Sequence, residues 1–236
     1  MRARVILSRI DGEESPRRRG FLAALGMTLL LAACSTRPPA GAPLAPVSAS
    51  SADEALRILE ARAAELQGAR SLMHMRATSG ERVQSFKAQL QLDPHAMLLT
   101  VYTPLNTTAM RVYADDSGVV FTNDLEQTAW RGSAAEFARN FGFFGELAPR
   151  DVAKLLIGLP GSRAATYEAT PAGLARATAG DVTIAYAPPS FPPSRITVTR
   201  GAQTLEIESL GTVASSERVE PLAVPAGYRC CVAPKM

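Results

Sequence analysis

The stretch RVQSFKAQLQL, residues 82–92, decides the fold class because its side chains alternate between apolar and polar from Ser85 onward. In an extended chain, successive side chains point to opposite faces. The apolar set is Phe86, Ala88, Leu90 and Leu92, and the polar set is Ser85, Lys87, Gln89 and Gln91. This period of two predicts a β-strand with one face toward a core and the other toward solvent.

Further strands are expected on both sides of this one. The same period begins at Ser71, and turn signals such as Asp93-Pro94 and the DDSG sequence at residues 115–118 separate the segments that follow. The other expected strands cover residues 97–101, 109–114, 118–122, 165–169, 174–179, 182–186, 195–200 and 204–212. The sequence therefore predicts an antiparallel meander of about ten or eleven strands.

Helices are expected in two places. One begins after the N-cap candidate Ser51 and ends at Gly68. A helical insertion is expected at residues 133–159, where Ser133 and Glu136 have the spacing of a capping box. Its apolar positions are Phe137, Phe141, Phe144, Val152, Leu155, Leu156 and Leu159. The simplest architecture wraps a curved sheet around these helices. The pattern leaves open whether the space between them is filled or hollow.

The first 33 residues resemble a bacterial lipoprotein signal peptide. A basic run at residues 17–19 precedes an apolar run at 21–31, which is shorter than the roughly 20 residues of a membrane-spanning helix. The segment LLAAC then resembles a lipobox, which implies cleavage before Cys34 and acylation of that cysteine, palmitate included. A plain secretory signal is the alternative. Sec export is favoured over the twin-arginine route that RRGFL at 18–22 also resembles, and Ser35 favours the outer membrane over the inner.

Four regions are expected along the 236-residue chain. Residues 1–33 form the signal peptide, 34–51 the lipidated cysteine and a linker rich in Pro, Ala and Ser, 52–215 the folded domain, and 216–236 a tail with Cys230 and Cys231. The signal carries six arginines and three acidic residues, a net charge of +3 that equals the charge of the whole chain. The remainder is therefore nearly neutral, which argues against nucleic-acid binding through a basic face.

The sequence lacks the common catalytic and metal-binding patterns. Its two histidines, His74 and His95, have no partner at metal-ligand spacing, and no GxSxG, GxGxxG or P-loop motif occurs. The acidic pairs at 115–116 and 124/126 fall in expected turns, where solvated side chains are ordinary. We therefore expect a binding protein and not an enzyme, with no cofactor and no metal.

Three segments resemble, in the same order, the LolB family of outer-membrane lipoprotein receptors. They are LLTVYTPLNTTAMRV (98–112), APRDVAKLLIGLPG (148–161) and FPPSRITVTRGAQTLEIESLG (191–211), and the resemblance spans roughly residues 70–213. It implies a half-open β-barrel with a helical lid around an apolar cavity that receives lipoprotein acyl chains from a LolA-like periplasmic carrier. It also implies that Leu105, in a protruding turn, contacts the membrane. The family usually has Gly where this chain has Asn106, and Asn tolerates the same left-handed backbone.

If the interior is hollow, apolar residues of the strands and the insertion should line it. The expected lining residues are Phe86, Leu90, Leu99, Val101, Phe137, Phe141, Phe144, Leu155 and Leu156. The expected protein is a lipid-anchored, periplasm-facing monomer of the outer membrane, with acylated lipoproteins and the carrier as partners and a chaperone role in lipoprotein localisation. The alternative is a non-catalytic assembly or sensor lipoprotein of the same fold, with a filled core or another lipid ligand.

Overall fold

One antiparallel sheet makes up most of the molecule, which confirms the predicted fold class. The computed structural model describes residues 41–141, 143–161 and 164–230. Its 12-stranded sheet has the order β12-β6-β5-β4-β3-β2-β1-β11-β10-β9-β8-β7, and β12–β6 is the parallel pair. The strands are β1 (Ala69–Ser79), β2 (Arg82–Leu92), β3 (Met97–Tyr102), β4 (Thr108–Asp115), β5 (Gly118–Asn123), β6 (Thr128–Gly132), β7 (Thr166–Thr170), β8 (Gly173–Ala179), β9 (Val182–Tyr186), β10 (Arg195–Arg200), β11 (Gln203–Ala214) and β12 (Arg229–Cys230).

The central strands separate apolar from polar side chains as the sequence predicts. β2 pairs with β1 along its whole length, from Ala69 opposite Leu92 to Ser79 opposite Arg82. Met75 and Phe86 are cross-strand neighbours on the concave face, while His74 and Lys87 are neighbours on the convex face. Apolar side chains therefore gather on the concave side, where the core forms. Two of the twelve strands, β6 and β12, lie outside the segments that the sequence predicts.

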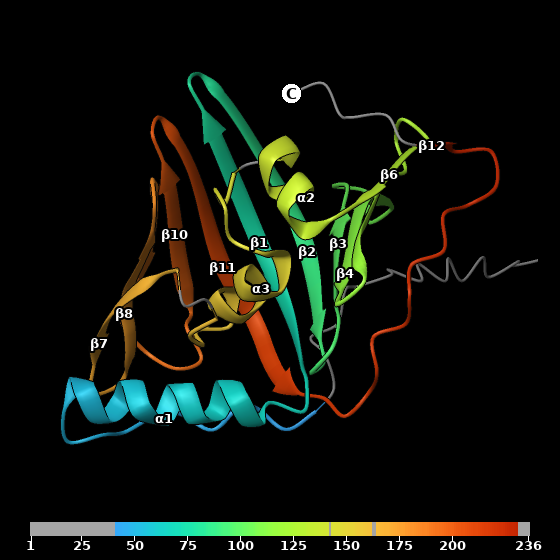
Figure 1. The fold of residues 1–236 in the computed structure, drawn as a ribbon. Coiled ribbons are helices and arrows are strands. Elements are labelled where there is room, and N and C mark those ends of the chain that lie inside the picture. The colour runs from blue at the N-terminus through green and yellow to red at the C-terminus, as the bar shows by residue number, and fades with distance from the viewer. Residues whose placement is uncertain (1–40, 142, 162–163, 231–236) are drawn as a thin grey trace, which may run out of the picture. The chain divides into compact units, whose positions relative to one another are not determined.

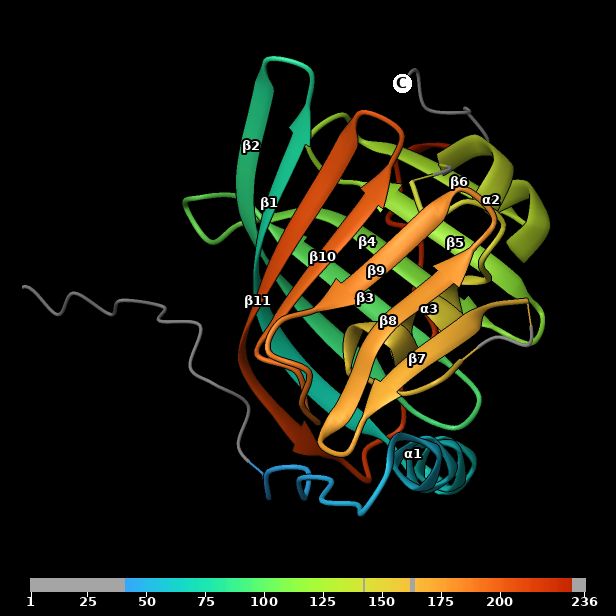
Figure 2. The ribbon, with the colours of Figure 1, turned by 90° about the vertical axis from the view of Figure 1, so that its left-hand side faces the viewer.

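The helices occupy the concave side and one end of the curled sheet. They are α1 (Ala52–Glu65), α2 (Ala134–Phe141) and α3 (Pro149–Leu156). Figure 1 shows α2 and α3 between the β7–β10 side and the β3–β6 side of the sheet, and Figure 2 shows β8 crossing in front of α3. α1 packs against β7 and β8 at one end. The expected arrangement of a leading helix and a helical insertion under a curved sheet is therefore present.

The segment before α1 lies against the domain. The sequence predicts a free linker up to residue 51, but Pro43 forms a bridge with Val213 and the Ala49 amide donates to the carbonyl of Pro171 (3.0 Å). Val47 is only 6% exposed and belongs to the main core. Prolines prevent regular secondary structure here, but they leave single apolar side chains able to pack. Residues 41–51 are thus part of the folded domain.

The segment after β11 also lies against the domain instead of forming a free tail. Its path crosses the convex face of β3–β5, where Val219 is 6% exposed and packs with Ala96 and Tyr113. The Val219 amide donates to Oδ2 of Asp93 (2.7 Å). The segment ends in β12, which extends the sheet beside β6. We call residues 216–230 the C-terminal strap.

Candidate functional site

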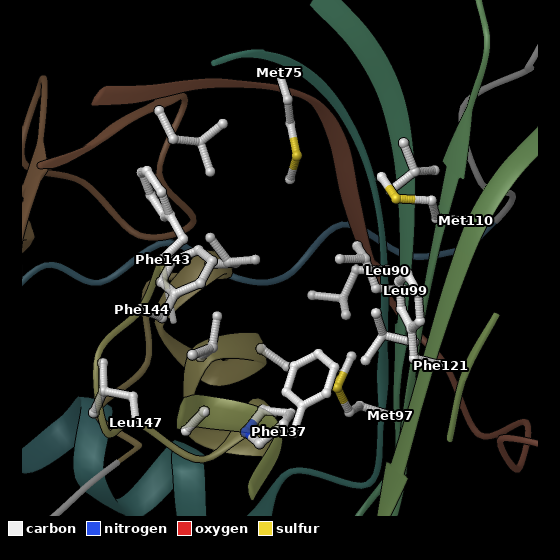
Figure 3. A pocket seen from close by; sticks show the side chains of 18 of the residues that line it. Met75, Leu90, Met97, Leu99, Met110, Phe121, Phe137, Phe143, Phe144 and Leu147 are labelled. Atoms are coloured by element: carbon white, nitrogen blue, oxygen red, sulfur yellow. The ribbon is translucent and has the colours of Figure 1, made fainter. Parts of the chain in front are cut away.

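An apolar cavity of about 280 Å³ lies between the concave face of the sheet and the helical insertion. Figure 3 shows strand residues on one wall and the phenylalanines of the insertion on the other. Every lining residue is apolar or glycine, so the wall offers no charged side chain to a ligand. The lining residues are Met75, Ala77, Phe86, Leu90, Met97, Leu99, Val101, Met110, Val112, Phe121, Phe137, Ala138, Phe143, Phe144, Gly145, Leu147, Pro149, Val152, Ala153, Leu156 and Leu205.

The exposure of the lining residues shows where the cavity is accessible. The β1–β2, β3–β4 and β5–β6 turns lie at one end of the sheet, which we call the turn end. Near it, Phe86 and Met110 are half-buried. Farther from it, Leu90 is 1% and Met97 is 3% exposed. The cavity is therefore closed at Leu90 and Met97 and is accessible at Phe86 and Met110.

Seven of the nine predicted lining residues line this cavity: Phe86, Leu90, Leu99, Val101, Phe137, Phe144 and Leu156. Leu155 does not, although it is fully buried. Leu155 precedes Leu156 by one residue, so its side chain points about 100° away around α3. Its carbonyl accepts a hydrogen bond from the Tyr186 hydroxyl at the end of β9 (3.0 Å). Leu155 is therefore buried in the core but does not line the cavity, contrary to the prediction. The side chain of Phe141 lies outside the described residues.

Three methionines that are not among the predicted lining residues also line the cavity: Met75, Met97 and Met110. The signal was present, because Met97 shares the strand face of Leu99 and Val101, and Met110 is paired with Val101 across β3 and β4. Methionine is flexible and fits irregular apolar space. The wall formed by these residues can therefore adapt to apolar ligands of different shape.

The helical insertion that covers the cavity begins with a capped helix, α2, and packs through aromatic side chains. The predicted capping box is present: the Glu136 amide donates to Ser133 Oγ (3.2 Å), and the Ser133 amide donates to Glu136 Oε2 (2.9 Å). The rings of Phe137 and Trp130 lie 5.8 Å apart, which joins α2 to β6. The lid is therefore held at α2 by a cap and by aromatic packing.

The turn between β3 and β4 presents Leu105 to solvent, as expected from the sequence. Leu105 is 87% exposed and Asn106 has a φ of 59°, the left-handed conformation that the sequence predicts. The Thr103 amide donates to the carbonyl of Thr107 (2.8 Å), and their hydroxyls lie 2.7 Å apart. The leucine is thus exposed on a turn held by its own hydrogen bonds.

The histidines and the acidic turn residues noted in the sequence lie at the surface or form turn hydrogen bonds. His74 is exposed on β1, and His95 is exposed with Nδ1 3.7 Å from Asp116 Oδ2. Oδ1 of Asp115 accepts from the amides of Ser117 (2.8 Å) and Gly118 (3.1 Å), as a turn residue does. Within the described ranges, no three His, Cys, Asp or Glu residues come together as metal ligands.

Two further features bear on the anchor. None of the helices in the part of the chain that the structure describes is long and apolar enough to cross a membrane. Cys34, the expected lipidation site, lies outside the described residues, as does Cys231, while Cys230 is exposed.

No protein-family model matches the sequence, and no curated protein matches it significantly. Among solved structures, it is similar to a DUF1329 family protein from Desulfovibrio piger at 10% identity, with a TM-score of 0.51 over 70% of this chain and 92% of that chain. A LolA superfamily protein from Nitrosomonas europaea is 8% identical, with a TM-score of 0.44 over 71% of this chain and 95% of that one. A Vibrio parahaemolyticus domain described as an outer membrane lipoprotein-sorting protein is 12% identical, with a TM-score of 0.48 over 71% and 95%. Of these three, the first establishes that the chain shares the fold of that DUF1329 family protein.

Proposed function

We propose that the protein is an outer-membrane lipoprotein that takes the acyl chains of other lipoproteins into its cavity and passes them to the membrane. The observation that carries this proposal is the wholly apolar wall of the cavity. Each methylene removed from water contributes about 0.8 kcal/mol, so an acyl chain is the kind of ligand that such a wall favours. The resemblance to the LolB family supports the same function, and the lipobox supports the anchor.

Transfer in this proposal needs no covalent chemistry. A LolA-like carrier presents the acyl chains at the turn end, where half-buried Phe86 and Met110 give access to the cavity. The chains leave through the same end when the bilayer offers a larger apolar volume. Only a difference in affinity between cavity and membrane is required to drive this step. Leu105 lies at that end and is the predicted membrane contact.

The alternative, an assembly or sensor protein, differs from the proposal in its interior and its ligand. A filled core would leave no space between sheet and insertion, so the cavity of about 280 Å³ supports the proposal. This volume is near the lower end of ligand pockets in general, which range from about 300 to 1,000 Å³. A ligand with one slender apolar chain suits it better than a bulky one.

Two alanines of α2 provide a matched test of the cavity. Ala138 lines the cavity, whereas Ala135 on the same helix is exposed. Ala138→Phe should place a ring where acyl methylenes would lie. Excluding two methylenes lowers affinity for a fluorescent palmitoyl probe by about tenfold. Ala135→Phe should leave that affinity unchanged.

The same pair should differ in delivery. With an acylated protein as cargo and outer-membrane lipid vesicles as acceptor, Ala138→Phe should slow insertion and Ala135→Phe should not. Thermal unfolding of both variants checks that each is folded. Equal probe affinity in the two variants would contradict acyl binding in this cavity. Lower probe affinity with unchanged insertion would show that acyl binding in this cavity is not used for delivery, which favours the alternative, an assembly or sensor lipoprotein of the same fold.

A further inference from the structure

Two large apolar side chains at the turn end are the most exposed leucines among the described residues. Leu105 is 87% exposed between β3 and β4, and Leu125 is 67% exposed between β5 and β6. Because β4 and β5 are paired, the two turns belong to neighbouring hairpins. Adjacent strands lie about 4.8 Å apart, which places the centres of these hairpins about 10 Å apart. The two leucines thus project from the same end of the sheet.

The turn that carries Leu125 is held as firmly as the turn that carries Leu105. Oδ1 of Asn123 accepts from the amides of Leu125 and Glu126, both at 3.1 Å. The Asp124 amide donates to the carbonyl of Ala109 (2.8 Å), which joins the turn to the start of β4. The C-terminal strap adds a bond from the Arg229 amide to Gln127 (2.9 Å). The exposed side chain is therefore preorganised, so little ordering is needed when a partner covers it.

Charges beside Leu125 are balanced. Asp124, its neighbour, pairs with Arg111 at 3.1 Å. Arg229 of the strap lies beside the exposed Glu126, whose carbonyl it contacts at 3.4 Å. A turn with two acidic and two basic side chains has no net charge to attract anionic or cationic groups. Apolar contact is what this turn has to offer.

Both leucines are only a few residues from the cavity lining along the chain. Val101 precedes Leu105 by four residues, Phe121 precedes Leu125 by four, and both line the cavity. Even a fully extended chain of four residues covers at most about 13 Å. A surface that contacts both turns therefore lies within about that distance of the cavity lining, at the end where the cavity is accessible.

We propose that Leu125 is a second lipid-contacting residue, which together with Leu105 seats the turn end of the sheet on a phospholipid bilayer. One contact leaves the domain free to rotate about a point. Two contacts about 10 Å apart define a line and so hold the open end of the cavity toward the bilayer. The proposed lipid contact is inferred from the two turns alone. Its use in lipoprotein delivery rests on the proposed function.

Tryptophan substitution in the full chain tests this proposal directly. We compare Leu105→Trp, Leu125→Trp and, as a control, Leu210→Trp on vesicles of phosphatidylethanolamine with and without brominated acyl chains, which quench indole fluorescence on contact. Leu210 is also exposed, at 41%, but lies on β11 toward the opposite end from the turns. Native Trp130 is 7% exposed and supplies a constant background.

The brominated lipid should reduce the added fluorescence of Leu105→Trp and Leu125→Trp at least twofold and leave that of Leu210→Trp unchanged. The reduction should persist in high salt, because the turn has no net charge. Quenching of Leu105→Trp alone overturns the second contact and leaves the proposed function intact. Equal quenching of all three overturns a specific seating. The affinity of Ala138→Phe for the palmitoyl probe does not depend on these quenching results. It therefore tests acyl binding in the cavity separately from membrane contact by the turns.

Discussion

Among single residues, Asp93 joins two distant parts of the chain through one carboxylate. Oδ1 accepts from the amides of His95 (2.7 Å) and Ala96 (2.6 Å), and Oδ2 accepts from the amide of Val219 (2.7 Å). Burial by itself would raise the pKa of Asp93, but the three amide donors and the nearby His95 hold it below its ordinary value. The ionised carboxylate is therefore the form that fastens the C-terminal strap.

Asp93→Asn should release the strap and keep the turn. The amide oxygen can still accept from His95 and Ala96, but an NH2 group would face the amide of Val219. Leaving a buried donor unpaired costs about 1–3 kcal/mol. Hydrogen exchange should become faster at Val219 and remain slow at Ala96. Equal protection at both amides in the variant would contradict this role.

The same residue predicts a pH dependence of stability. Because the folded-state pKa of Asp93 is lowered, its stabilising effect is present above the unfolded pKa of about 3.9 and is lost as pH falls through the folded value. Wild type should therefore lose more unfolding free energy than Asp93→Asn below about pH 4. Denaturant unfolding at pH 7 and at pH 3 measures the difference.

Single residues also show what the sequence could and could not predict. Leu105 was predictable as an exposed turn residue, because Pro and Asn around it specify a turn. Asp93 was predictable only as a turn former, since its third partner, Val219, is distant in sequence. Leu125 lies in a turn with acidic neighbours, and an isolated leucine there has no distinguishing pattern. Local sequence patterns predict turns, but they do not predict contacts between segments that are distant in the chain.

At the scale of elements, α3 ends in a glycine cap that packs closely against Pro193. Gly158 has a φ of +84°, and its amide donates to the carbonyl of Leu155 (3.0 Å) while the Leu159 amide donates to Lys154 (2.9 Å). A β-carbon at Gly158 would lie 2.7 Å from Cδ of Pro193. Glycine is therefore required both for the left-handed cap and for the close approach.

Gly158→Ala should lower the free energy of unfolding by about 2–4 kcal/mol, the sum of backbone strain and overpacking. Gly80→Ala is the matched control, because Gly80 has a φ of +59° but no atom within 4 Å of an added β-carbon. The control should lose only about 1 kcal/mol. Urea unfolding measures both. Equal losses would show that contact with Pro193 is not limiting.

Elements were predicted well where the periodic pattern is long and poorly where it is short. β2 spans the eleven residues of the alternating stretch, and the capping box correctly placed the start of α2. β6 has five residues, and β12 has two that pair only because the strap brings them beside β6. On α3, Leu155 and Leu156 are adjacent, and a helical pattern alone does not divide a wide apolar face between core and cavity.

At the scale of the whole molecule, segments at both ends of the described chain cover the sheet. Residues 41–51 and the C-terminal strap have few periodic features, so their composition predicted a linker and a tail. Their docking depends on single residues, Val47 and Val219, each 6% exposed. Such packing requires a preformed surface, and so it could be seen only in the folded structure. The cavity likewise follows from curvature of the sheet, which strand periodicity does not specify.

Anchoring also belongs to this scale, and Cys34 should be the acylated residue. In cells labelled with alkyne-palmitate, the wild-type protein and Cys230→Ala should carry the label, whereas Cys34→Ala should not. The control is appropriate because Cys230 is an exposed cysteine, so access alone would allow it to be acylated. Label on Cys34→Ala would place the acylation elsewhere in the chain.

The sheet has two edges that are not paired with each other: β7 is one edge strand, and β6 with the short β12 forms the other edge. Widening the space between them therefore breaks no ladder hydrogen bond within the sheet, and it disturbs mainly the contacts of methionine and phenylalanine side chains. Rotamer changes of side chains take picoseconds to nanoseconds when they are exposed, whereas local unfolding takes microseconds to seconds. The barrier to entry of an acyl chain into the cavity is thus set by rotamer changes of the lining side chains and by displacement of the helices. In the proposed function, an acyl chain can therefore enter while all strands of the sheet stay paired.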